Sequence, residues 1–126
     1  MADKDEWSER FEQALRGEVL PGQRFVAEHD RVYMAGLANF LQTIFGREDN
    51  LVTPQMREMI IIAIQAAAGD WDVVRAHIRR AWAIDVPSKM ILETLEIAAI
   101  AGGAGALYGG AAVLGEELKA AGKSFA

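Results

Sequence analysis

Residues 51–85, LVTPQMREMIIIAIQAAAGDWDVVRAHIRRAWAID, decide the fold, because they have the pattern of two helices joined by a short turn. Thr53 and Pro54 are typical of a helix start: the hydroxyl can cap free N–H groups, and proline loses no hydrogen bond in the first turn. Apolar residues then recur every three or four positions as far as Gly69, a residue common just after a helix. We therefore expect a buried helix, a Gly-Asp turn and a second helix.

Three polar side chains stand out in this apolar stretch. Glu58 and Gln65 are seven residues apart, so they share one face of the first helix, and His77 lies beside the apolar stripe of the second. A buried carboxylate is costly unless it is paired. For Glu58 two compatible interpretations stay open: a salt bridge to an arginine such as Arg57 or Arg79, or a carboxylate that orients His77. For His77 the alternatives are a structural role and general acid–base catalysis, which suits an imidazole near neutral pH.

Several strings in this half of the chain resemble one known family. They are REMIIIAI from residue 57, HIRRAW from residue 77, VPSKMILETL from residue 86 and AAIAGGA from residue 98. The pattern over about residues 50–118 is similar to the carboxymuconolactone decarboxylase family, which includes the AhpD-like alkylhydroperoxidases. The resemblance implies an all-α, AhpD-like helix bundle that assembles into a homo-oligomer, a trimer or a hexamer. We expect one such domain over residues 1–126, with N-terminal helices in residues 1–49.

The resemblance also separates two branches of chemistry. AhpD-like peroxidases resemble E-x11-C-x2-C-x3-H, and counting from Glu58 places the two cysteine positions on Asp70 and Val73 and the histidine on His77. The chain contains no cysteine, so the thiol, sulfenic acid and disulfide cycle of those enzymes is excluded. The decarboxylase branch is similar in using the histidine of an H-[IV]-R segment without thiols. Residues 46–51, GREDNL, depart from the Trp-x-Arg-Pro-Gly-Leu-like stretch usual in that branch, which leaves the substrate open.

An arginine would suit a substrate carboxylate, because a guanidinium matches its planar shape. Arg79 lies two residues after His77 and points about 160° away around an ideal helix, whereas Arg80, three residues on, points closer to it. The resemblance favours Arg79 and helix geometry favours Arg80, so both stay candidates. The alternative for these arginines and for Arg57 is a solvated surface.

The remaining candidate pocket residues each have a structural alternative. Asp70 either caps the following helix or lines the place of the missing thiol, with Trp71 as a pocket wall. Tyr33 either lies in the core or reaches the pocket with its hydroxyl. Gln65 completes the predicted substrate-binding set.

The rest of the chain is also expected to be helical, since no stretch alternates with a period of two. A first short helix presents an apolar stripe of Trp7, Phe11, Ala14 and Leu15, and a single long helix is predicted over residues 23–45. A further helix begins near Ser88, a break is expected at residues 102–105, and a last helix runs from about residue 106 to 120. The spacing of Gly105 and Gly109 would permit close helix contact.

Composition narrows the possible partners. The 126 residues are 52% apolar and 25% charged, which suits a globular domain with one core. A net charge of −5 argues against nucleic acid or an anionic membrane as the main partner. The uncharged run 97–115 is mostly glycine and alanine, which favours tight helix packing over a membrane span. The first ten residues, MADKDEWSER, lack the apolar core of a secretory signal, so the cytoplasm is expected.

Cofactors are not expected either. The chain has two histidines and no cysteine, which makes a metal site improbable, and its glycine-rich run does not follow a strand as a nucleotide site requires. The sequence thus predicts a cofactor-free, thiol-independent lyase or proton-transfer enzyme acting on a small carboxylated or lactone-type metabolite. The catalytic pair would be His77 and Glu58. The alternative is a non-catalytic, oligomeric binding or scaffold protein derived from an AhpD-like peroxidase.

Overall fold

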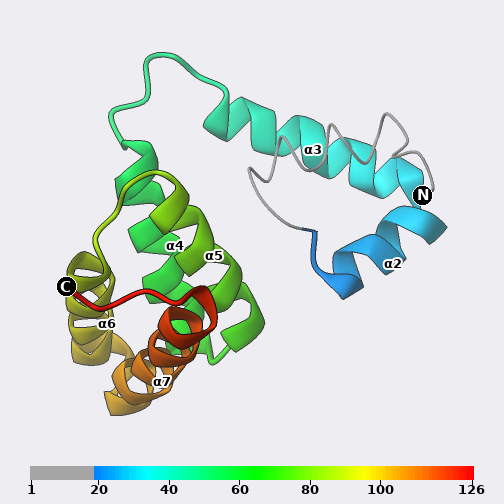
Figure 1. The fold of residues 1–126 in the computed structure, drawn as a ribbon. Coiled ribbons are helices and arrows are strands. Elements are labelled where there is room, and N and C mark those ends of the chain that lie inside the picture. The colour runs from blue at the N-terminus through cyan, green and yellow to red at the C-terminus, as the bar shows by residue number, and fades with distance from the viewer. Residues whose placement is uncertain (1–18) are drawn as a thin grey trace. The chain divides into compact units, whose positions relative to one another are not determined.

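The computed structural model of the chain describes residues 19–126, and every regular element in this range is an α-helix (Figure 1). The helices are α2 (Pro21–His29), α3 (Arg31–Phe45), α4 (Pro54–Ala68), α5 (Trp71–Ala83), α6 (Ser88–Gly102) and α7 (Ala104–Ala121). The all-α prediction is confirmed for these residues. The expected first helix with Trp7 and Phe11 lies outside them. The chain divides into two compact units, residues 1–51 and 52–126, each described by itself.

In the first unit, α2 and α3 pack together around a small cluster formed by Ala27 and Met34. The prediction of one helix over residues 23–45 is wrong, because the chain breaks at Asp30. Asp30 has φ −145° and ψ 78°, outside the helical region, and its carboxylate accepts a hydrogen bond of 3.0 Å from the backbone N–H of Tyr33. Aspartate favours such caps over helix interiors, so Asp30 ends α2 and begins α3.

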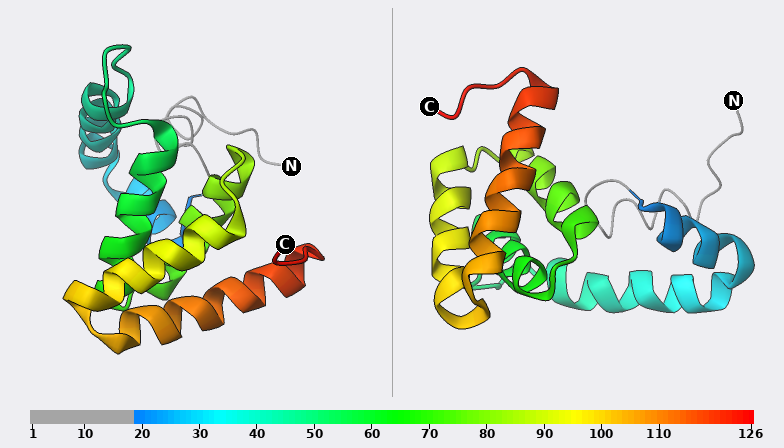
Figure 2. Two further views of the ribbon diagram at one scale, coloured as in Figure 1. Left: turned by 90° about the vertical axis from the view of Figure 1, so that its left-hand side faces the viewer. Right: turned by 90° about the horizontal axis from the view of Figure 1, so that it is seen from below.

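The second unit is a four-helix bundle in which α4 contacts the other three helices. The helices α6 and α7 join at Gly103 and pack along each other with opposite chain directions (Figure 2). Helix α5 packs against α4 and α7. The core centres on fully buried aliphatic side chains of α4, α5 and α6: Ile62, Val74, Ile78, Ile91 and Leu95. Each such side chain contributes roughly 1.5–3 kcal/mol on burial, so α5 and α6 are held to α4 mainly by this core.

The ends of these helices follow the sequence pattern. The Thr53 hydroxyl accepts a hydrogen bond of 3.1 Å from the N–H of Met56 at the start of α4. Gly69 closes that helix with φ 73°, and Asp85 ends the turn after α5 with φ 63°. Both values lie in the left-handed region, which glycine adopts freely and aspartate tolerates better than most residues.

Close helix contact occurs at one of the two glycines expected to permit it. A Cβ atom on Gly109 of α7 would collide with the six-membered ring of Trp71, whereas one on Gly105 would meet open space. The first turn of α5 therefore lies directly against the backbone of α7.

The uncharged run 97–115 is divided between α6 and α7 by Gly103, which has φ 86°. Among the helices of residues 19–126, none combines the length and hydropathy that a bilayer crossing requires.

Candidate functional site

The two predicted catalytic residues meet between α4 and α5. The Nδ1 atom of His77 lies 2.5 Å from Oε2 of Glu58, a short, charge-assisted hydrogen-bond distance. The Glu58 side chain is 3% exposed and that of His77 is 12% exposed. The turn at Gly69 and Asp70 makes this contact possible, because it returns α5 alongside α4 and turns the polar flank of α5 toward Glu58.

The second carboxylate oxygen of Glu58 faces Arg57. The distance from Arg57 Nη2 to Oε1 is 3.6 Å, within ion-pair range but longer than a hydrogen bond. Of the two arginines proposed as partners for Glu58, Arg57 is therefore the one in place. The carboxylate is shared between a guanidinium, which stays charged, and an imidazole, which can gain or lose a proton.

The other ring nitrogen of His77 is available for chemistry. Among residues 19–126, Nε2 has no hydrogen-bond partner, and it is not one of the fully buried polar atoms that lack one there. Nε2 therefore keeps contact with solvent. A carboxylate at Nδ1 favours the ring form that carries a proton on Nδ1, which leaves the lone pair on Nε2. The pair can thus accept a proton at Nε2 and return it, while Glu58 stabilises the charged ring.

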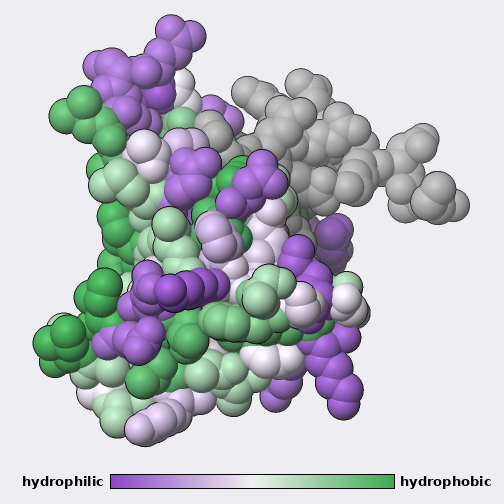
Figure 3. Space-filling model, turned by 60° about the vertical axis from the view of Figure 1, so that its left-hand side comes forward, coloured by the Kyte–Doolittle hydropathy of each residue, from purple (hydrophilic) through white to green (hydrophobic). Residues whose placement is uncertain are grey.

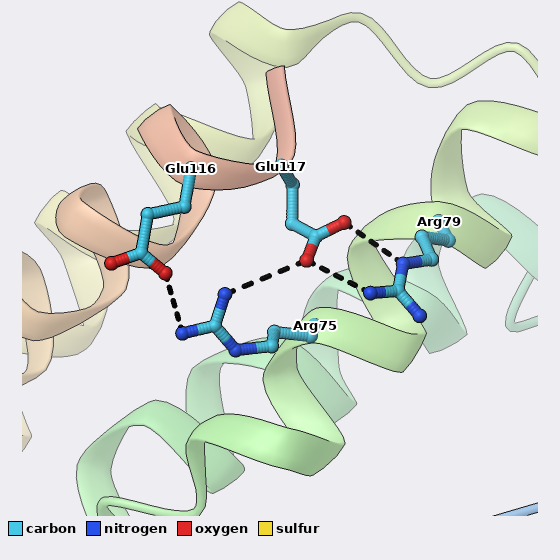
Figure 4. A network of polar contacts seen from close by, with 4 residues as sticks. All are labelled: Arg75, Arg79, Glu116 and Glu117. Carbon is cyan, nitrogen blue, oxygen red and sulfur yellow. Dashed lines mark hydrogen bonds and ion pairs between the residues drawn. The ribbon is translucent and has the colours of Figure 1, made fainter. Parts of the chain in front are cut away.

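On the opposite flank of α5, two arginines reach carboxylates of α7 (Figure 4). Arg79 donates from Nε to Oε2 of Glu117 at 2.8 Å and from Nη2 to Oε1 at 2.9 Å. Arg75 Nη1 lies 3.5 Å from Oε1 of Glu117, and its Nη2 lies 2.6 Å from Oε2 of Glu116. Glu117 is only 6% exposed, so its charge is held inside the bundle by two guanidinium groups.

The charges in this network shift the ionisation of its members. The hydrogen bond from Arg79 lowers the pKa of Glu117 below its usual value, against the opposing effect of burial. The hydrogen bond to Glu116 raises the pKa of Arg75 further. Both shifts favour the charged forms, so the network stays intact at neutral pH.

Glu117 was not among the residues singled out from the sequence. The signal was its place one turn after Val113 and Leu114, which are both buried. An acid that continues a buried apolar stripe predicts a cationic partner on a neighbouring helix.

The other predicted site residues of α5 take separate positions. Arg79 is bound to Glu117 on the α7 flank, and Arg80 is partly buried. The carboxylate of Asp70 accepts a hydrogen bond of 3.4 Å from the N–H of Val73, so it caps α5 as one interpretation held. Trp71 packs against the core, with its ring on Gly109.

Two more predicted residues lie on other helices. Gln65 is partly buried on α4, on the face that carries Glu58. Tyr33 belongs to α3 of the first unit, where it is 59% exposed, so it is no core residue of that unit. Within residues 19–126 there is no group of three His, Cys, Asp or Glu side chains placed to hold a metal ion.

The fold and the site define an all-α protein with a buried acid–imidazole pair and, since the chain has no cysteine, no thiol. The carboxymuconolactone decarboxylase family model matches residues 32–116, a span that contains both members of the pair. The chain belongs to the carboxymuconolactone decarboxylase family, as the sequence strings indicated. No curated protein and no solved structure matches the chain.

Proposed function

We propose that this protein is a cofactor-free, thiol-independent enzyme that decarboxylates, or moves a proton on, a small carboxylated or lactone-type metabolite. The observation that carries the proposal is the 2.5 Å contact between Glu58 and His77. It supplies a general acid–base group with a fixed orientation and a second ring nitrogen that faces solvent. Membership of the family supports the substrate class. Thiol-dependent peroxide reduction is not proposed, because the chain has no cysteine.

In the decarboxylation, the bond between the substrate carbon and its carboxylate breaks and carbon dioxide leaves. The electron pair of that bond stays on the carbon, delocalised into the neighbouring unsaturated lactone. His77, as an imidazolium, donates its Nε2 proton to this carbon, and solvent protonates the ring again. Glu58 holds Nδ1 throughout and offsets the charge of the imidazolium. In a proton-transfer reaction the neutral ring accepts a substrate proton at Nε2 and returns it to another atom.

For the substrate carboxylate we favour Arg80 over Arg79. Arg80 lies about 60° from the His77 direction around α5, whereas Arg79 directs Nε and Nη2 at Glu117. Gln65 would add an amide on the Glu58 face of α4. Asp70, Trp71 and Tyr33 are secondary candidates, because the first two already cap and pack α5.

The test is an assay of purified protein with small lactone carboxylic acids, following carbon dioxide release and deuterium uptake from heavy water. Replacing His77 by alanine is expected to lower turnover by about 10²–10⁴-fold, the usual contribution of general acid–base catalysis. His29→Ala is the matched control, since the chain has only these two histidines and His29 is exposed on α2. Full turnover in His77→Ala would refute the mechanism. Binding of such acids without turnover would favour a non-catalytic binding protein.

The same proposal includes self-association. Met56, Ile60 and Ile64 form an exposed row along α4, on the side of the helix opposite Glu58, and Ile97 and Ile100 are exposed on α6, which packs against α4. Figure 3 shows hydrophobic side chains gathered along one edge of the face that it presents. Exposed apolar groups of this kind often mark subunit interfaces, and we propose a trimer or a hexamer.

Sedimentation of Ile60→Glu tests this part of the proposal. The buried charge is expected to shift the protein toward monomer, whereas Ile60→Val keeps an apolar face and the assembly. A wild-type protein that sediments as a monomer at micromolar concentration would reject the assembly and leave the acid–imidazole pair untouched.

A further inference from the structure

We infer that Glu117 is a positioning residue for His77: by holding Arg79 and Arg75, this carboxylate of α7 fixes the orientation of α5 that brings His77 onto Glu58. The inference rests on the proposed function only where it calls the His77–Glu58 pair catalytic. The geometric part concerns the placement of a helix and is tested without a substrate.

Apolar and polar side chains occupy different sides of α5. Val74, Ile78 and Ala81, three of its four buried residues, form one apolar face. At about 100° per residue, His77 lies on one side of that face, and Arg75 and Arg79 lie about 160–200° away from His77, around the other side of the helix. The helix is therefore bound to α4 by the polar contact of His77 and to α7 by those of Arg75 and Arg79, with the apolar face between them.

The apolar face restrains the rotation of the helix less sharply than a directional contact does. Hydrophobic burial is non-directional, and the three side chains of this face, Val74, Ile78 and Ala81, are all small or branched. Hydrogen bonds to a guanidinium are directional, and a two-pronged contact fixes the planes of both groups. Arg79 makes such a contact with both oxygens of Glu117. The contact of Arg79 with Glu117 thus adds a directional restraint to the apolar packing of α5, which includes the ring of Trp71 on Gly109.

The hydrogen bond between His77 and Glu58 is sensitive to small displacements of α5. At 2.5 Å the two atoms are at the short limit of a hydrogen bond, and a separation larger by about 1 Å would lose it. A misplacement of about 1 Å at a reacting group can lower catalysis by about 10²-fold. A small rotation of α5 would therefore change the protonation pattern of the His77 ring before it unfolds the bundle.

Glu117 is held in place because its buried carboxylate needs its cationic partners. Its carboxylate is nearly excluded from solvent, and a buried charge without its partners is strongly unfavourable. Arg79, by contrast, is 49% exposed, and Glu116 is 61% exposed. Glu117 is thus the buried carboxylate at the centre of the network, whereas Glu116 joins the network from the exposed surface.

The experiment compares Glu117→Gln with Glu116→Gln in the full chain. Both substitutions remove one negative charge from neighbouring residues of α7, and both residues contact Arg75, but of the two acids only Glu117 binds Arg79. The readout is the pair of ring-nitrogen NMR shifts of His77, detected through its carbon-bound ring protons. They report which nitrogen carries the proton. The chain has only one other histidine, so assignment by His77→Ala is direct.

In the wild type at alkaline pH we expect the proton on Nδ1, facing Glu58. In Glu117→Gln we expect the two nitrogen shifts to move toward the average of the two ring forms, and in Glu116→Gln we expect no change. Where a substrate is turned over, kcat in Glu117→Gln should fall about tenfold with KM retained, a smaller effect than a full 1 Å misplacement.

Folded Glu117→Gln with unchanged His77 nitrogen shifts would overturn the inference, even if His77→Ala abolishes turnover. Changed shifts in a protein that turns over no substrate would support the inference while the proposed function fails. If Glu117→Gln does not fold, Arg79→Lys decides, because it keeps the charge and removes the two-pronged geometry at a half-exposed position. The same change in the His77 shifts is then expected, and unchanged shifts contradict the inference.

Discussion

Glu58 and Glu117 are both buried carboxylates of the same bundle, and both contact side chains of α5, yet the groups that bind them differ. Glu58 meets an imidazole at 2.5 Å and a guanidinium only at 3.6 Å. Among residues 19–126, Glu117 meets two guanidinium groups and no imidazole. A guanidinium keeps its proton at all pH values of interest, whereas an imidazole exchanges its proton near neutrality. The α4 flank of α5 therefore carries a side chain that can exchange a proton, whereas the α7 flank carries ion pairs of fixed charge.

The largest effect is expected for a substitution of Glu58, the carboxylate that contacts His77. Glu58→Gln keeps the shape of the side chain but cannot offset an imidazolium, so turnover should fall by about 10²-fold or more. The free energy of unfolding should fall by only about 1 kcal/mol, because the amide still accepts a hydrogen bond. Steady-state assays and denaturant unfolding measure both values. A large loss of stability without loss of turnover would reverse the roles given to the two carboxylates.

At the structural side, the double substitution Arg75→Gln with Arg79→Gln leaves Glu117 buried without a cation. Breaking a buried ion pair costs about 3–5 kcal/mol, and since Arg79 is half exposed we expect a loss of about 2–3 kcal/mol in unfolding free energy at pH 7. Urea unfolding followed by circular dichroism measures this. A loss of unfolding free energy as small as that of an exposed ion pair, about 0–1 kcal/mol, would show that other groups stabilise the Glu117 carboxylate.

The pH dependence of stability sharpens the same contrast. Arg79 holds the pKa of Glu117 below its ordinary value of 4.5, so this group stabilises the fold above pH 4.5. That contribution is lost as pH falls through the lowered, folded-state pKa. In the double arginine variant, burial without cations would raise the pKa, and acidification toward pH 4 should then stabilise the fold relative to pH 7. Thermal melts from pH 7 to pH 3 compare the two proteins; parallel curves would contradict the assignment.

The smallest effect is expected for Glu116→Gln. Its ion pair with Arg75 is short, at 2.6 Å, but the carboxylate is 61% exposed, and exposed pairs contribute about 0–1 kcal/mol. Melting temperature at low and high salt measures it. A loss as large as that of the double arginine variant would mean that exposure does not separate the two neighbouring acids.

Local signals in the sequence were sufficient for most of the helical framework. The Thr53 cap, the left-handed Gly69 and Asp85, and the break at Gly103 all depend on the backbone preferences of single residues. The break at Asp30 was missed because the apolar period continues through it. The capping preference of aspartate was the competing signal, and it prevailed.

The two carboxylates also differ in how far the sequence predicts their partners. The pairing of Glu58 with His77 was predictable, since both residues flank one short turn and the family pattern relates them. The pairing of Glu117 with Arg79 was not predicted, because it joins residues 38 positions apart across a contact between α5 and α7 that no local pattern specifies. Side-chain spacing indicated the direction of Arg79, away from His77, without indicating its partner.

Trp71 and Trp82 stand in the first and last turns of α5, and their surroundings differ. The ring of Trp71 lies on the bare backbone of Gly109, while Trp82 donates its indole proton to Ser88 and lies 5.1 Å from the ammonium group of Lys123. The only other indole in the chain is that of Trp7, and a Trp7→Phe variant would remove it. Ultraviolet emission from such a protein would report separately on the departure of α7 and on the loosening of the C-terminal tail, with no dye attached.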